Sequence, residues 1–249
     1  MFGTAALVLV GSGTVVATLT LAGKNVPAVR EADFLPIAFA FGMILMVLVY
    51  AIGKVSGCHI NPAVTFALAV TRRFPWKEVP LYWGGQFVGA VIGALAVWGV
   101  FGSNAVALGM GQTHIAADAS SAVYLQAALA EALGTGLLVF AILGIVDSKS
   151  PTQLAGLVIG GALAANILIF GPITGASLNP ARAFGPELVQ AIAGGTTFWT
   201  QYVPVYLVSG FAGAAAAALL YDLLATPRLV EQPIVEAVSH DDSGSSVRR

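Results

Sequence analysis

Six long apolar stretches constrain the fold of this chain more than any other feature of its sequence. The hydrocarbon core of a bilayer is roughly 30 Å thick, so a helix needs about 20 apolar residues to cross it. The stretches that meet this length are Met1–Ala22, Phe34–Gly53, Val79–Phe101, Ala122–Val146, Gln153–Phe170 and Thr200–Leu224. They predict an all-α membrane protein with six transmembrane helices and the lipid bilayer as its surroundings.

The composition excludes the main alternatives to a membrane protein. Of the 249 residues, 57% are hydrophobic and only 9% are charged, whereas about 25% of the residues of a soluble domain are charged. A disordered chain would need few apolar residues, and a net charge of −1 gives no basic field for nucleic acid. The only cysteine is Cys58 and the three histidines lie far apart, so we expect no disulfide, metal or cofactor.

The charges in the links between the stretches predict the orientation. Arg72, Arg73 and Lys77 follow the second stretch against one acid, Glu78, and Lys149 follows the fourth. The positive-inside rule then places the links 71–78 and 147–152 in the cytoplasm, together with both termini, because the number of spans is even. We expect a multi-pass protein of the cell (plasma) membrane, with residues 226–249 forming a flexible cytoplasmic tail.

Two further apolar stretches, Pro62–Val70 and Pro180–Ile192, are too short to cross a bilayer. At 1.5 Å per residue they span roughly 14–20 Å, about half the membrane. We therefore expect two re-entrant half-helices.

The two short stretches begin with related sequences. Ser56–Ala63 reads SGCHINPA, and Thr174–Ala181 reads TGASLNPA. Gly3-Thr4 also matches Gly134-Thr135. These pairs divide a single domain, residues 1–225, into two repeats of about 1–110 and about 122–225. Each repeat holds three spans and one half-span, and an odd number of spans requires opposite insertion, so the chain is predicted to be an inverted repeat.

Asn-Pro-Ala is a local signal for the start of a helix, because Asn is a preferred N-cap and Pro is favoured at the first helical position. One copy occurs at many ordinary helix starts. Here two copies open half-length segments in opposite halves of the chain, which indicates a functional site. The residues concerned are Asn61, Pro62, Ala63, Asn179, Pro180 and Ala181.

These motifs resemble the aquaporin (major intrinsic protein) family, over nearly the whole chain from Gly3 to about Asp222. The resemblance implies six tilted helices and two half-helices that meet head to head at the centre of the bilayer. It also implies a homotetramer with one pore in each subunit, passing water and small neutral solutes.

Irregular backbone at membrane depth must line a water-filled cavity or be buried in protein. We therefore expect the backbone before each half-helix to supply a ladder of pore-lining carbonyl acceptors. Both half-helix N-termini, each carrying roughly half a positive charge, should meet at the amides of Asn61 and Asn179 and repel cations and hydronium. The predicted carbonyls belong to Gly57, Cys58, His59, Gly175 and Ser177.

A second constriction is expected at Arg182, because an arginine within the membrane is costly and marks a functional site. The resemblance adds Phe41, Ile167 and Ala176 as the other members of a selectivity filter. Strict water channels usually carry His where this chain has Ile167, and strict glycerol channels have a second aromatic residue and an Asp after the Arg, where Ala183 stands here. The filter is intermediate and similar to that of archaeal-type aquaporins, which predicts a water pore wide enough for some small neutral solutes.

Glu131 lies within the fourth apolar stretch, where a carboxylate is costly unless it is hydrogen-bonded. The resemblance implies that it supports the pore-loop backbone. The repeat places its first-half counterpart directly before Met1, so we expect that the sequence begins too late or that the first helix is trimmed.

Three alternatives to a water channel remain at this stage. A glycerol facilitator is the first. An ion-coupled carrier usually needs several intramembrane charges, and here only Glu131, Arg182 and, near a span end, Lys54 qualify. A membrane enzyme would need a nucleophile–base pair, metal set or cofactor motif that the sequence lacks, so no enzymatic activity and no catalytic residue is expected.

Overall fold

The computed structural model describes residues 1–23, 29–115, 120–147 and 150–225. The predicted tail at 226–249 and the predicted cytoplasmic residue Lys149 lie outside the described residues. Within the described ranges all regular structure is helical, and six helical segments are long and apolar enough to cross a membrane. The all-α fold with six spans is thus confirmed.

The spans follow the predicted stretches to within a few residues. The long helices are α1 (Phe2–Leu21), α2 (Phe34–Ser56), α4 (Val79–Phe101), α6 (Ser121–Val146), α7 (Ala155–Thr174) and α10 (Ser209–Ala225). Short turns join them: Glu31–Asp33, Trp76–Glu78, α5 (Ser103–Ala107), Gly109–Gly111 and Thr152–Leu154. The last span begins earlier than α10, with α9 (Trp199–Gln201) and a π-helical segment, Tyr202–Val208.

The last two spans differ from the prediction in detail, and both differences involve proline or glycine. Helix α7 continues through Pro172 to Thr174 instead of ending at Phe170, and it stops where Gly175 adopts a left-handed conformation with φ of 77°. The last span widens into a π-helix around Pro204, whose nitrogen cannot donate a helical hydrogen bond.

The half-helices α3 (Pro62–Val70) and α8 (Pro180–Ile192) have the bounds that the sequence predicts. The Asn61 side chain accepts a hydrogen bond of 2.9 Å from the Ala63 N–H. The Asn179 side chain accepts one of 3.0 Å from the Ala181 N–H. Each asparagine therefore caps its half-helix. The proline that follows it stands in the first helical turn, where the backbone N–H has no helical partner and its absence costs no hydrogen bond.

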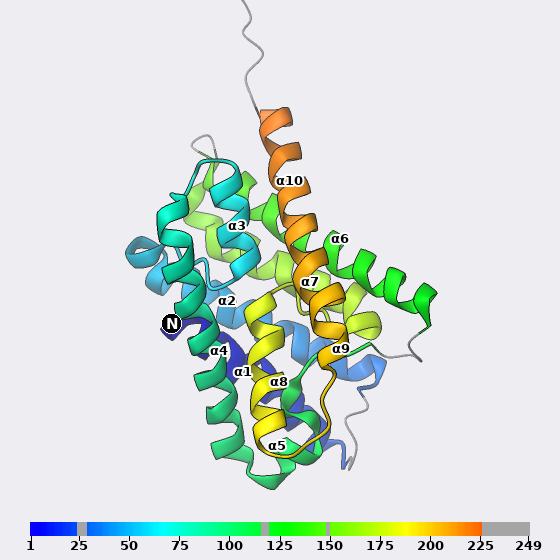
Figure 1. Cartoon of the computed structure of the whole chain (residues 1–249). Coiled ribbons are helices and arrows are strands. Elements are labelled where there is room, and N and C mark those ends of the chain that lie inside the picture. Colours follow the sequence, from blue (N-terminus) through cyan, green and yellow to red (C-terminus); the bar gives the residue numbers. More distant parts are fainter. Residues whose placement is uncertain (24–28, 116–119, 148–149, 226–249) are drawn as a thin grey trace, which may run out of the picture.

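The two halves of the chain pack in matching ways (Figure 1). Helix α1 packs on α4 as α6 packs on α10, and α2 crosses α7 between the halves. Half-helix α3 packs against α10, and α8 packs against α4, so the last long helix of each half supports the half-helix of the other. This exchange brings the N-termini of α3 and α8 together in the middle of the molecule.

The crossing of α2 and α7 depends on two glycines at matching positions of the repeat. A Cβ atom on Gly42 would collide with the carbonyl oxygen of Gly160, and a Cβ atom on Gly160 would collide with that of Gly42. Any side chain at either position would push the two helices apart. Such small-residue contacts are typical of helix packing in membranes.

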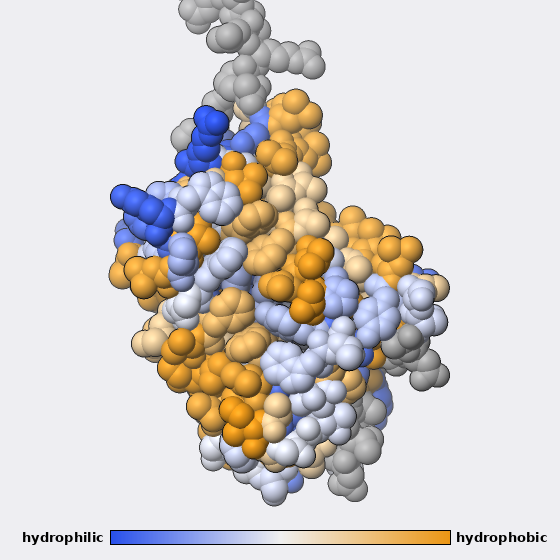
Figure 2. All heavy atoms as spheres, viewed as in Figure 1, coloured by the Kyte–Doolittle hydropathy of each residue, from blue (hydrophilic) through white to orange (hydrophobic). Residues whose placement is uncertain are grey.

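The outer surface is apolar around the long helices. Leu21, Val55, Leu81, Leu125 and Leu223 are each more than 70% exposed, which water would not tolerate over so many helices. On the face drawn in Figure 2 the most hydrophilic residues gather at the end of the molecule near α3 and the C-terminal end of α10. The chain is therefore a multi-pass membrane protein with lipid-facing helices.

Candidate functional site

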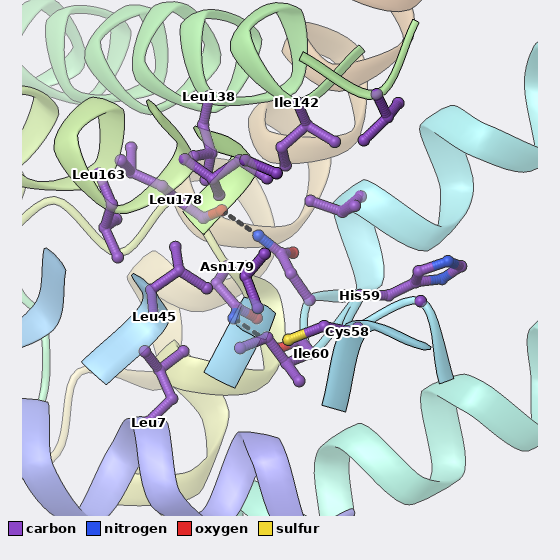
Figure 3. A pocket seen from close by; sticks show the side chains of 18 of the residues that line it. Leu7, Leu45, Cys58, His59, Ile60, Leu138, Ile142, Leu163, Leu178 and Asn179 are labelled. Atoms are coloured by element: carbon purple, nitrogen blue, oxygen red, sulfur yellow. Dashed lines mark hydrogen bonds between the residues drawn. The ribbon is translucent and has the colours of Figure 1, made fainter. Parts of the chain in front are cut away.

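A cavity of about 750 Å³ lies between the two halves. Long helices α2, α6 and α7 supply a mostly apolar wall, which includes Leu45, Leu138, Ile142 and Leu163 (Figure 3). The segments before the two half-helices supply a further part of the lining, which includes polar residues. We name them the first pore loop (Gly57–Asn61) and the second pore loop (Gly175–Asn179).

The two pore loops share an unusual backbone conformation. In the first, φ is 69° at Gly57, 50° at Cys58 and 41° at Ile60; in the second, the matching residues Gly175, Ala176 and Leu178 have φ of 77°, 44° and 52°. Non-glycine residues adopt such angles at a cost of about 1–3 kcal/mol each, and the cost is concentrated at functional sites. Because the same pattern occurs in both loops, we infer that both have the same role at the site.

At the centre, each asparagine amide reaches the opposite loop (Figure 3). Asn61 Nδ2 donates to the Leu178 carbonyl oxygen at 2.7 Å. Asn179 Nδ2 donates to the Ile60 carbonyl oxygen at 3.0 Å. The sequence predicts that each amide points an N–H into the pore; it does not predict the hydrogen bonds between the two halves. An amide nitrogen carries two hydrogens, so one N–H of each asparagine remains for the cavity that both residues line.

Glu131 supports the second pore loop from behind and is fully buried. Its Oε1 accepts hydrogen bonds from Thr174 Oγ1 at 2.7 Å and from the Ser177 N–H at 2.8 Å. Its Oε2 accepts a bond of 2.7 Å from the Leu178 N–H. The carboxylate thus fixes the backbone of a loop that lines the cavity.

The first pore loop is supported by a different set of side chains. The His59 ring leaves the cavity (Figure 3) and its Nδ1 lies 3.2 Å from Thr65 Oγ1, while Gln86 Nε2 donates to the same hydroxyl at 2.9 Å. The ring also packs against Phe74 and Tyr82, with centroids 4.8 and 5.0 Å apart. His59 therefore lines the cavity with its backbone, and no local sequence pattern marks Thr65, Phe74 and Tyr82 as partners of its ring.

The four predicted filter residues all line the cavity, and each is at most 4% exposed. The Arg182 guanidinium carbon is 5.0 Å from the centroid of the Phe41 ring, and Nη1 donates to the Gly111 carbonyl oxygen at 3.0 Å. Ile167 and Ala176 complete the lining. Sequence reasoning missed Gly111; its only local signal is the Gly-Met-Gly turn in which it stands.

Several predicted residues do not line the cavity. The Gly175 carbonyl is not part of the lining, and the Gly175 N–H ends α7 by donating to Gly171 at 2.9 Å. The Pro and Ala of both Asn-Pro-Ala motifs form the first turns of α3 and α8 instead. Across the described ranges there is no group of three or more side chains that could hold a metal ion.

The link before α6 and the segment after α8 are tied together. The Ile115 N–H donates to Gln201 Oε1 at 2.8 Å, and the His114 ring stacks on Phe198 with centroids 4.8 Å apart. Burial lowers the pKa of His114 from its ordinary value of 6.5, so the ring is neutral at neutral pH and adds no charge here.

Cys58 provides a test of which atoms face the cavity. It lines the cavity, and Figure 3 shows its sulfur on the side of Asn179. Because thiol sulfur binds soft metals, mercuric ion is expected to reduce water permeability of reconstituted protein, and added thiol should restore it. Cys58→Ser should resist mercury while keeping its flux; equal inhibition of both proteins would show that the sulfur is not at the pore.

Three comparisons place these features among known proteins. A family model described as "Major intrinsic protein" matches residues 1–221. A probable aquaporin AqpM of Archaeoglobus fulgidus is 42% identical over 90% of this chain and 94% of its own length. Aquaporin AqpM of Methanothermobacter marburgensis is 40% identical over 89% of this chain and 94% of its own. The X-ray structure of the aquaglyceroporin from Plasmodium falciparum superposes with a TM-score of 0.79 at 27% identity, covering 91% of this chain and 94% of that one.

Proposed function

The chain belongs to the major intrinsic protein family and is a passive membrane channel for water and small neutral solutes, and we propose that the two pore loops carry out the selection. The observation that carries this proposal is the pair of cross-bonded asparagines, Asn61 and Asn179, at the N-termini of two opposed half-helices. Members of this family are channels and not enzymes.

At the centre, the remaining N–H of each asparagine amide donates to the oxygen of a passing water. Its hydrogens then point away from the centre in both directions, which interrupts the chain of hydrogen bonds along which a proton would move. The positive ends of α3 and α8 add a barrier for cations and hydronium. Water passes because the loop carbonyls replace its lost hydrogen bonds.

At the filter, Arg182 forms the polar side of the pore and Phe41 forms an aromatic side. Ile167 adds an apolar wall without a donor, and Ala176 leaves room beside it. A solute that passes must accept a hydrogen bond from the guanidinium and tolerate apolar contact. This combination of filter residues supports the passage of water together with small neutral solutes.

Water and glycerol fluxes measured in the same proteoliposomes test the proposal. We expect water permeability clearly above that of empty liposomes, with a measurable and smaller glycerol flux. Water flux equal to that of empty liposomes would overturn the proposal.

Glycerol facilitation is the second candidate function. It is favoured by the apolar Ile167 in the filter and by the structural similarity to a Plasmodium aquaglyceroporin. Glycerol flux that exceeds water flux, per unit of driving force, would favour this function. Uphill uptake driven by an ion gradient would instead indicate the carrier that the sequence left open.

We also propose the placement and assembly of the chain. The basic residues Arg72, Arg73 and Lys77 of the link between α3 and α4 support a cytoplasmic position for that end, for both termini, and for the cytoplasmic tail at 226–249. Residues 1–225 would then form one channel domain in the plasma membrane, made of repeats of about 1–110 and 122–225. Assembly as a homotetramer is carried by the resemblance, and native mass spectrometry of the solubilised protein tests it.

A further inference from the structure

Helix α1 carries a buried Gly-Ser-Gly sequence in its middle, formed by Gly11, Ser12 and Gly13. Glycine is less favourable than alanine inside a helix, so two glycines within three residues need a cause in the packing around them. The surroundings of the two glycines differ, and the difference locates that cause at Gly11.

Gly11 lies against the ring of Phe41. A Cβ atom on Gly11 would stand 2.0 Å from Cε1 of this ring, 2.3 Å from Cζ and 2.4 Å from Cδ1. Because the three distances are nearly equal, the added atom would lie over the face of the ring and not beyond its edge. Any side chain at position 11 would therefore overlap with the ring where it now lies.

Gly13 has no such neighbour. A Cβ atom on Gly13 would lie 3.7 Å from both Phe101 and Val97, which is ordinary van der Waals contact. An alanine therefore fits at position 13 without any displacement. Of the two glycines, Gly11 is the one whose missing side chain makes room for a residue of the pore.

The repeat shows that the glycine accompanies the large ring. At the offsets of the repeat, Gly11 of α1 corresponds to Ile142 of α6, and Phe41 of α2 corresponds to Ile159 of α7. Both isoleucines line the cavity. The shared backbone thus accepts a large side chain at this position of the first helix of a half, provided that the residue facing it is smaller than phenylalanine.

The same part of α1 also lies behind the other side of the filter. A Cβ atom on Gly111 would stand 2.5 Å from the Ser12 carbonyl oxygen, so the turn that contains Gly111 packs directly on the backbone of α1. The Gly111 carbonyl accepts the hydrogen bond from Arg182. Adjacent residues of α1 therefore support both Phe41 and the acceptor of Arg182.

The close contacts of α1 decide which group moves when position 11 is enlarged. On the side of α4, a Cβ atom on Gly93 would stand 2.5 Å from the Ala5 carbonyl oxygen, so the backbone of α1 is confined there as well as at Ser12. The Phe41 ring, by contrast, turns about its own side-chain bonds. Protein interiors are close-packed, and the open space beside the ring is the cavity that it lines. A methyl group at position 11 therefore moves the ring into the cavity.

We propose that Gly11 is a specificity-determining positioning residue, which leaves room for the Phe41 ring behind the cavity wall and thereby sets the width of the filter. The inference rests on the proposed channel function and on the proposed filter. Since glycerol is larger than water, a change of width acts first on glycerol. Gly11 thus admits small polyols to a pore whose filter residues would otherwise pass mainly water.

Water and glycerol permeabilities of Gly11→Ala in proteoliposomes test the proposal. The ratio of glycerol to water permeability should fall by about tenfold, because space for one methyl group in a binding site gives discrimination of this order. Water flux should remain clearly above that of empty liposomes. An unchanged or increased ratio, or a water flux equal to that of empty liposomes in this variant alone, would overturn the proposal.

Gly13→Ala is the matched control. It makes the same substitution in the same helix, with the same gain in helix propensity, and its added methyl group meets only ordinary contacts. This variant should keep the permeability ratio of the parent. An equal fall in Gly11→Ala and Gly13→Ala would show that the Phe41 ring is not involved, and would overturn the proposal.

A second background separates the effect on the ring from a general role in helix packing. Phe41→Val lacks Cδ1, Cε1 and Cζ, the three atoms that the added methyl group would meet. Adding Gly11→Ala to this background should leave the ratio where Phe41→Val alone places it, since residues in contact have non-additive effects. A role in helix packing alone would lower the ratio equally in both backgrounds, and that result would overturn the proposal.

Melting temperatures in detergent follow the same logic. Gly11→Ala should lower the melting temperature of the parent, and it should not lower that of Phe41→Val. If Gly11→Ala does not fold, the double variant should still fold, and a double variant that also fails would overturn the proposal. Failure of the channel function is a separate result, because it is a parent protein whose water flux equals that of empty liposomes.

Discussion

Replacing Glu131 with glutamine is expected to remove most of the water permeability and to lower the stability of the protein. The substitution keeps the size of the side chain but replaces one acceptor oxygen with an NH₂ group. Glu131 accepts three hydrogen bonds through two oxygens, two of them from the backbone of the second pore loop. In the variant at least one buried donor faces another donor, which costs about 3 kcal/mol.

The measurement is stopped-flow water permeability of proteoliposomes with matched protein content, together with the melting temperature in detergent. Glu78→Gln is the matched control, because Glu78 is exposed in the link before α4 and should leave both values unchanged. A Glu131→Gln protein with the water flux and melting temperature of the parent would show that the carboxylate does not hold the loop.

Replacing Arg182 with valine is expected to change what the pore admits. The matching position of the first half is Val64, so the variant makes the two halves alike. It removes a fully charged group that lies 5.0 Å from the Phe41 ring centroid and donates to Gly111. We expect the ratio of glycerol to water permeability to rise by about tenfold, because one specific contact in a binding site is worth that much discrimination. Proton leakage should rise as well, since a positive charge leaves the pore.

Glycerol and water fluxes, with a pH-sensitive dye inside the vesicles, measure both effects. Arg182→Lys keeps the charge without the planar guanidinium and should give intermediate values. Arg73→Val is the matched control: Arg73 pairs with Asp222 at 2.6 Å, but both side chains are about one-third exposed, and such a pair contributes about 1 kcal/mol or less. Unchanged solute rejection in Arg182→Val would argue against the proposed filter.

The elements that the sequence could predict are those with strong local signals. The half-helices have the predicted bounds because Asn61 and Asn179 cap them and a proline fixes the first position. The end of α7 could not be placed, since Pro172 is tolerated inside a membrane helix and only Gly175 stops it. The π-helical segment at Tyr202–Val208 depends on packing around Pro204, for which the sequence carries no pattern.

The residues of the candidate site also fall into two groups, those that could be predicted from the sequence and those that could not. Residues with a motif or an intramembrane charge, such as Asn179, Arg182 and Glu131, could be named from the sequence. The carbonyl of Gly111 could not, because any residue has a carbonyl and nothing local marks this one. The pore-loop carbonyls were predicted as a group, but the pairing of Leu178 with Asn61 and of Ile60 with Asn179 was not. These contacts were accessible only through the fold, which sets the distance between segments that lie far apart in the chain.

The exchange of hydrogen bonds between Asn61 and Leu178 and between Asn179 and Ile60 has a consequence for biogenesis. Chains emerge from the ribosome N-terminal half first, so the first pore loop enters the membrane before its partner exists. Until the second half is inserted, the Asn61 amide and the Ile60 carbonyl must be hydrated or held by the insertion machinery. The pore can therefore close only after the second pore loop has been inserted, and a nascent chain arrested before residue 174 would leave an incomplete, hydrated half-pore.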